Sequence, residues 1–197
     1  GSSELHVAQS LTFKSMLQAK ELAQKKIEIE LFATQFFDED LLAPTGVNAT
    51  APLERSILDI AQFNRQRRLP LISDILENAY KASSGKYLIY TNIDIGLMPH
   101  FYLMVKELIA EGLDAFVINR RTIPKNVGSL NYALSEIGDS HPGYDCFVFR
   151  RELIPQFNLG NVCIGAGWVG RMLIANLLIH TESFKIFENL HLTFHLG

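Results

Sequence analysis

The sequence has only two cysteines among its 197 residues, Cys146 and Cys163. They lack the spacing of metal ligands and cannot form a framework of disulfides, which predicts a reduced, cytoplasmic protein. The sequence also has no apolar run of about 18 residues and no charged-then-apolar signal pattern at its start, so no transmembrane segment is expected.

An excess of positive charge is missing as well, because the formal net charge is -3 and the isoelectric point is about 6.1. This balance gives no electrostatic reason to expect a nucleic-acid partner. The chain contains no phosphate-binding P-loop and no Gly-x-Ser-x-Gly motif, and its Gly-x-Gly-x-x-Gly pattern at residues 165–170 does not directly follow an expected strand. These observations disfavour P-loop nucleotidases, serine hydrolases of the α/β class and classical dinucleotide-binding proteins.

What the sequence does have is an ordinary globular composition, with 48% hydrophobic and 20% charged residues, and we expect one domain over residues 1–197. Helical and strand patterns alternate, which predicts an α/β fold with a central, mostly parallel mixed sheet in a three-layer sandwich. The expected helices cover residues 7–23, 53–63, 70–83, 101–110, 132–137 and 169–178. The expected strands cover residues 27–31, 87–91, 115–119, 145–149, 184–187 and one or two stretches within 190–196.

The stretch from Tyr87 to Thr91 is a continuous apolar run typical of a strand covered on both faces. It leads directly into Asn92 and Asp94, and in open α/β sheets ligands bind outside the carboxyl ends of the strands. Carboxylate and amide oxygens at such a place suit Mg²⁺ or Mn²⁺, which can neutralise a diphosphate. The alternative is that both side chains only cap the turn.

Arginine pairs follow or flank several predicted elements, at Arg67-Arg68, Arg120-Arg121 and Arg150-Arg151. Arginine at the carboxyl end of a strand suits bidentate binding of phosphate, and Arg120 and Arg121 fit that condition best. For any single pair, solvated surface charge is the alternative reading.

Two histidines near the end of the chain, His191 and His195, lie four residues apart. On a strand these four residues span about 13 Å, too far for the two side chains to share one metal ion. His195 alone could complete a site begun by Asp94, or it could be a surface histidine.

Several of these features together resemble a glycosyltransferase of the GT-A fold. They are Asn92-Ile-Asp94, the helix that follows Arg68-Leu-Pro70, the strand Tyr144–Phe149, the turn Gly165-Ala-Gly-Trp168 and the late His195. The resemblance implies a protein that transfers a sugar from a nucleotide-diphosphate sugar to a carbohydrate or other hydroxyl acceptor, with Mn²⁺ or Mg²⁺ bound.

The resemblance also implies roles for individual residues. Asp94 and His195 would bind the metal, and Asn92 would make a polar contact to the nucleotide or sugar. Asp145 would be the catalytic base or contact the acceptor, and Trp168 would stack on a sugar. Arg68 belongs to the resembling helix start and, like Arg120 and Arg121, is a candidate to bind the substrate.

The sequence departs from the family pattern in two places. Asn92 replaces the first acid of the Asp-x-Asp triplet, which removes a negative charge and should weaken metal binding. The family fold begins with a strand that holds the nucleotide base, whereas the first element expected here is a helix. A non-catalytic GT-A-like domain that binds carbohydrate or a protein partner is therefore the competing interpretation.

A phosphohydrolase with an aspartyl nucleophile also places Asp-x-Asp after a strand. There the first acid must form the phospho-enzyme, and the amide of Asn92 cannot do so. We therefore rank this class below the other two.

Overall fold

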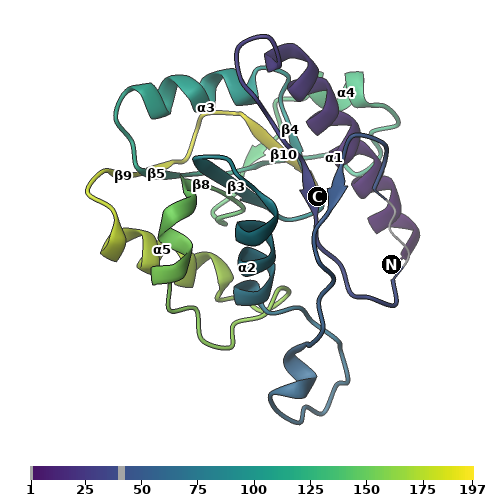
Figure 1. Ribbon diagram of the computed structural model, residues 1–197. Coiled ribbons are helices and arrows are strands. Elements are labelled where there is room, and N and C mark those ends of the chain that lie inside the picture. Colours follow the sequence, from purple (N-terminus) through teal and green to yellow (C-terminus); the bar gives the residue numbers. More distant parts are fainter. Residues whose placement is uncertain (1, 40–42) are drawn as a thin grey trace. The chain divides into compact units, whose positions relative to one another are not determined.

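The computed structural model describes residues 2–39 and 43–197 and is an α/β structure with mixed sheets, as predicted (Figure 1). Its described residues divide into two compact units. The first unit consists of residues 2–29, 87–149 and 181–197, and the second of residues 30–39, 43–86 and 150–180. That residues 1–197 form one domain stays a prediction.

The first unit contains two four-stranded sheets. Its strands are β3 (Tyr87–Thr91), β4 (Ile95–Leu97), β5 (Ala115–Ile118), β6 (Arg121–Ile123), β7 (Asp139–Ser140), β8 (Cys146–Arg150), β9 (Phe184–Phe187) and β10 (Thr193–Leu196). One sheet has the order β4-β10-β6-β7, with β10 antiparallel to β4 and parallel to β6. The other has the order β3-β8-β5-β9, with β5 antiparallel to β8 and parallel to β9. All four residues of β5 are buried, as its continuous apolar sequence predicts. The same prediction was wrong for β3, which lies at the edge of its sheet with all five residues only partly buried.

The helices of the first unit are α1 (Ser2–Ala23), α3 (Phe101–Ala110) and α4 (Leu130–Ser135). The sequence predicted all three to within a few residues. α1 packs against β4, α3 and α4. Leu11, Ser15, Ala19 and Ala23 are buried at every fourth position, so they form one stripe along the helix. Three of these four residues are small, which lets the strand approach closely.

A buried hydrogen bond fixes α1 on strand β4. The backbone N–H of Leu97 donates to Ser15 Oγ at 2.9 Å, and Ser15 Oγ donates in turn to the carbonyl of Thr12 at 2.7 Å. Ser15 is only 1% exposed, so these bonds satisfy a hydroxyl that would otherwise be costly to bury. α1 therefore holds β4 in place just after the Asn92–Asp94 segment.

Gly96 of β4 lies directly opposite Phe194 of β10. A Cβ atom at position 96 would overlap the ring of Phe194, which is 2% exposed and cannot swing into solvent.

We therefore expect Gly96→Ala to lower the free energy of unfolding by about 2–3 kcal/mol, measured by urea denaturation. In a Phe194→Leu background the same change should cost clearly less, because the smaller side chain leaves room for the new methyl group. Equal costs in both backgrounds would contradict this packing.

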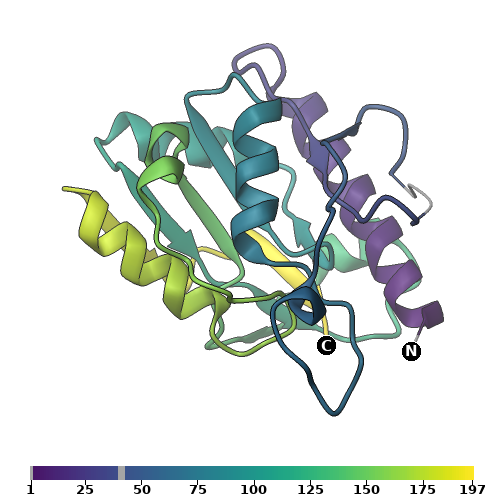
Figure 2. The ribbon, with the colours of Figure 1, turned by 60° about the horizontal axis from the view of Figure 1, so that its bottom comes forward.

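The described residues of the second unit form two α-helices, two short 3₁₀ elements and one two-stranded sheet. Its elements are β1 (Phe32–Ala33), β2 (Asn48–Ala49), the 3₁₀ turn η1 (Ile57–Asp59), α2 (Ile72–Ala82), the 3₁₀ helix η2 (Arg151–Gln156) and α5 (Val169–His180). β1 pairs with β2 in parallel. The turn η1 lies in a long loop that extends beyond the end of α2 (Figures 1 and 2). α2 and α5 confirm the helices predicted after Pro70 and from Val169.

Two predicted elements were wrong. Residues 27–31 keep an alternating exposure but form no strand, and the strand that the structure has instead is β1, directly after them. The carbonyl of Leu31 accepts the backbone N–H of Asn48 in β2. The helix expected over residues 53–63 is reduced to η1, which begins with a capping box formed by Ser56 and Asp59. Ile60 and Phe63 are 37% and 42% exposed, so no apolar surface supports a longer helix there. The short strands β4 and β6 were not predicted.

No helix in the described part of the chain is both long and apolar enough to span a membrane.

Candidate functional site

The first unit gathers polar side chains around the segment that follows β3. Tyr90, the fourth residue of β3, donates its hydroxyl hydrogen to Asn92 Oδ1 at 3.0 Å. Asp94 follows two residues later and is partly buried. The predicted strand end therefore carries the polar groups expected there, and the amide of Asn92 is already engaged by a neighbouring tyrosine.

Asp94 and His195, 101 residues apart in the chain, lie in direct contact. His195 Nε2 is 3.2 Å from Asp94 Oδ2. The antiparallel pairing of β4 with β10 explains this contact, since it places His195 opposite Ile95, the residue after Asp94. The side chain of His195 is 23% exposed and that of Asp94 is 31% exposed, so a ligand can reach both. His195 Nδ1 is buried without a hydrogen-bond partner in the described residues.

A second pair lies where β5 ends and β8 begins. Arg120 Nη1 forms an ion pair with Asp145 Oδ2 at 2.5 Å, and these side chains are 16% and 10% exposed. The antiparallel register, in which Ile118 pairs with Cys146, places the residues that follow β5 beside those that precede β8. Arg120 Nε is buried and has no hydrogen-bond partner among the described residues.

His141 stands next to this ion pair. Its Nε2 is 3.2 Å from Arg120 Nη2, and its Nδ1 accepts the backbone N–H of Gly143 at 2.8 Å. The Asn119 side chain donates to the carbonyl of His141 at 3.3 Å and so holds the turn. Asp145 Oδ2 lies farther from His141 Nδ1, at 4.0 Å.

Electrostatic effects connect the two pairs into one site. The hydrogen bond from His195 lowers the pKa of Asp94, and the charge of Arg120 lowers it further. Burial raises the pKa of Tyr90, and the charges of Asp145 and Asp94 add to that effect. Burial has the largest effect on His141 and lowers its pKa. The charge of Arg120 and, to a smaller extent, that of His195 lower the same pKa, while the charge of Asp145 raises it. Asp94 thus feels the charge of Arg120 from the other pair, and Tyr90 and His141 each feel charges from both pairs.

Asn92, Asp94, Arg120, Asp145 and His195 were all candidates from the sequence, and the structure places them in this one region of the first unit. Arg121, the first residue of β6, makes its contacts outside this region. Its guanidinium donates to the carbonyls of Ile137 and Gly138, where it fastens the loop before β7.

Arg68 and Trp168 belong to the second unit. Arg68 is bound to Asp38 and lies over the ring of Phe36, 3.8 Å from its centroid. Trp168 is 62% exposed, with the Arg171 guanidinium 5.1 Å from the centroid of its ring. The roles of Arg68, Trp168 and Arg121 in binding substrate stay predictions.

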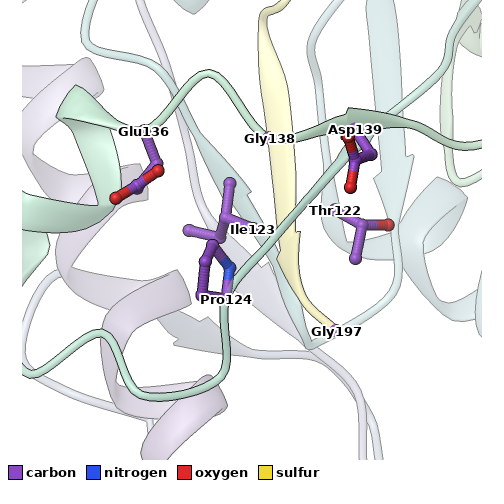
Figure 3. Close-up of a pocket in the computed structure, with 7 residues that line it drawn as sticks. All are labelled: Thr122, Ile123, Pro124, Glu136, Gly138, Asp139 and Gly197. Atoms are coloured by element: carbon purple, nitrogen blue, oxygen red, sulfur yellow. The ribbon is translucent and has the colours of Figure 1, made fainter.

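The first unit also has a pocket of about 380 Å³ beside β6. It is lined by Thr122, Ile123, Pro124, Glu136, Gly138, Asp139 and Gly197. Figure 3 shows the carboxylates of Glu136 and Asp139 apart, with Ile123 and Pro124 between them. The two acids do not converge on a common point, and none of the predicted site residues lines this pocket.

The contact between Asp94 and His195 fits two adjacent ligands of one divalent metal ion. Metal–ligand bonds of about 2.1–2.2 Å at right angles place neighbouring ligand atoms about 3 Å apart, close to the observed 3.2 Å. Among the described residues no group of three His, Cys, Asp or Glu side chains is arranged to hold a metal ion. Mg²⁺ and similar ions often take only one or two carboxylates, with substrate phosphates and water as the remaining ligands.

The depressed pKa of Asp94 has a consequence for stability in the metal-free protein. An unfolded aspartate has a pKa near 4, so the stabilisation from a depressed folded pKa is fully present above that pH. It is lost as the pH falls through the lower pKa of the folded protein. We expect urea unfolding in EDTA to show a shallower loss of stability below pH 5 for Asp94→Asn than for the wild type. Glu107→Gln, at an exposed position of α3, should keep the wild-type slope.

Tyr90, Asn119 and His141 are members of the site that were not predicted from the sequence. Tyr90 and Asn119 sit at strand ends and looked like ordinary sheet residues. His141 had a usable signal, because the turn His141–Tyr144 directly precedes the candidate Asp145.

Comparisons with known proteins add little to this geometry. No protein family model and no curated protein sequence matches the chain. Among solved structures, the chain is similar to the crystal structure of HddC from Yersinia pseudotuberculosis, with a TM-score of 0.47 and 10% sequence identity. The similarity covers 89% of this chain and 74% of that one, and at this TM-score it carries no argument about fold or function.

Proposed function

We propose that this chain is a glycosyltransferase-like protein of the GT-A type, a three-layer α/β fold that uses Mn²⁺ or Mg²⁺ to transfer a sugar from a nucleotide-diphosphate sugar to a hydroxyl acceptor. The observation that carries the proposal is the contact between Asp94 and His195. These two residues were predicted as metal ligands from distant parts of the sequence, and they lie 3.2 Å apart at the end of the predicted strand.

Each residue of the site has a part in this proposal. Asp94 and His195 would hold the metal, which would supply positive charge to neutralise the diphosphate. Arg120 stabilises the same charge, because its guanidinium lies within the electrostatic reach of Asp94. Asn92 offers a polar contact to the nucleotide or sugar, although its oxygen already accepts the hydroxyl of Tyr90.

Asp145 has two possible uses in the reaction. In the present arrangement it holds Arg120 in place through the ion pair at 2.5 Å. It can take the proton of an acceptor hydroxyl only if this ion pair opens when the acceptor binds, since its oxygen otherwise faces the guanidinium.

The competing proposal is a GT-A-like domain that binds carbohydrate or a protein partner without catalysis. One observation favours it: the first residue of the metal-binding triplet is Asn92, which carries no charge and is occupied by Tyr90. Titration calorimetry with UDP-glucose, UDP-N-acetylglucosamine and GDP-mannose in the presence of Mn²⁺ separates the two. Metal-dependent heat with one donor supports the transferase, and no heat with any donor contradicts it.

A further inference from the structure

His141 is a histidine whose protonation state can be read from its neighbours. The backbone N–H of Gly143 points at Nδ1 at 2.8 Å, so Nδ1 must supply a lone pair. With a proton on Nδ1, the N–H groups of Gly143 and His141 would face each other as two donors 2.8 Å apart. A neutral ring therefore carries its proton on Nε2.

Gly143 makes this hydrogen bond possible. A Cβ atom at position 143 would lie 2.6 Å from Cε1 and 2.8 Å from Nδ1 of His141, too close for any side chain. Only glycine lets the backbone N–H come this near to the ring.

The proton on Nε2 places two hydrogen-bond donors next to each other. Nε2 is 3.2 Å from Arg120 Nη2, which is also a donor, so the two groups cannot hydrogen-bond to each other. A protonated, positively charged ring would be worse, because it would oppose donors at both nitrogens and face the arginine charge. Burial and Arg120 lower the pKa of His141 accordingly.

His141 and Asp145 do not form a hydrogen-bonded pair, because they lie too far apart. Asp145 Oδ2 is 4.0 Å from Nδ1, beyond hydrogen-bond range, and Gly143 already occupies that nitrogen. A neutral ring with its proton on Nε2 has no free lone pair there, so His141 is not placed to act as a base through Nε2.

We propose that His141 Nε2–H and the Arg120 guanidinium form an oxyanion subsite, which binds a phosphate group of the donor. Two adjacent donors without an acceptor become favourable when one oxygen anion with several lone pairs receives both of them. The buried Arg120 Nε, which has no hydrogen-bond partner in the described chain, adds a third unused donor on the same guanidinium. The assignment of the phosphate to a nucleotide-sugar donor rests on the proposed function, whereas the subsite itself does not.

The subsite can be tested with inorganic pyrophosphate in EDTA, which removes any contribution from a bound metal. We expect His141→Leu to weaken pyrophosphate binding by about tenfold or more, because it deletes a hydrogen bond to a charged group. His141→Gln should bind within about threefold of the wild type, since the glutamine amide can place an N–H near the position of Nε2. His100→Leu, a change at an exposed histidine of the same unit, should leave binding unchanged.

Two readouts guard against misfolding and against a different role for the ring. Thermal melting shows whether each variant folds, and long-range ¹⁵N–¹H spectra of the wild type show which nitrogen of His141 carries the proton. A proton on Nδ1, absence of pyrophosphate binding by the wild type, or equal losses in the Leu and Gln variants would each overturn the subsite. Nucleotide-sugar binding in Mn²⁺ is measured separately, so a failed donor titration with intact pyrophosphate binding refutes only the proposed function.

Discussion

Asp94→Ala should lower the Mn²⁺-dependent affinity for a nucleoside diphosphate such as UDP by at least about a hundredfold. Loss of a group that merely supports a metal ligand typically costs 10- to 100-fold in metal affinity, and loss of the ligand itself should cost at least as much. Asp94 is the one carboxylate next to His195 Nε2, so no neighbour of the described site replaces it. Titration calorimetry with UDP and Mn²⁺ measures the change.

Glu107→Ala is the matched control for this experiment. It removes a carboxylate from an exposed position of α3 in the same unit, and it should leave the UDP affinity unchanged. If Asp94→Ala binds UDP and Mn²⁺ as tightly as the wild type, the metal does not sit at Asp94.

Breaking the ion pair between Arg120 and Asp145 should have the second large effect, this time on stability. Both side chains are largely buried, so removing one partner leaves a charge that water solvates poorly. We expect Asp145→Ala to reduce the free energy of unfolding by about 3 kcal/mol, measured by urea denaturation at neutral pH.

A second ion pair provides the control. Arg55 and Asp74 are also in direct contact, at 2.8 Å, but Arg55 is 52% exposed. Asp74→Ala should therefore cost less than about 1 kcal/mol. Similar costs for the two aspartate changes would show that burial does not decide the strength of the Arg120–Asp145 pair. In an Arg120→Met background, Asp145→Ala should cost much less, because no buried arginine charge is then left without its partner.

The sequence predicted the strand end of this site because the signal there is local. β3 is a continuous apolar run that stops at polar residues, and the position of Asp94 follows from that pattern alone. The helix α3 was predicted to the residue for the same reason, since its apolar residues and the following Gly112 lie close together in the chain.

What the sequence could not provide is the pairing of distant strands. His195 reaches Asp94 only because β10 pairs with β4, and β4 was not recognised as a strand. Its three residues are held by contacts outside themselves, including the hydrogen bond from Leu97 to Ser15 on α1. A three-residue strand stabilised by such tertiary contacts leaves too short a pattern to recognise.

The role of His141 was also out of reach from the sequence. It depends on the direction of one backbone N–H, that of Gly143, and on an arginine 21 residues away. The turn sequence suggested only a change of direction. The helix expected over residues 53–63 was wrong for the opposite reason. Its local pattern is helical, but its apolar residues Ile60 and Phe63 do not pack against an apolar surface.

The most direct measurement of the metal site is pulsed electron paramagnetic resonance on Mn²⁺ bound together with UDP. We expect a ¹⁴N coupling from a directly coordinated imidazole in the wild type, which disappears in His195→Gln and persists in His191→Gln. A wild-type complex with bound Mn²⁺ and no imidazole coupling, or a coupling that survives in His195→Gln, would contradict a metal held by Asp94 and His195.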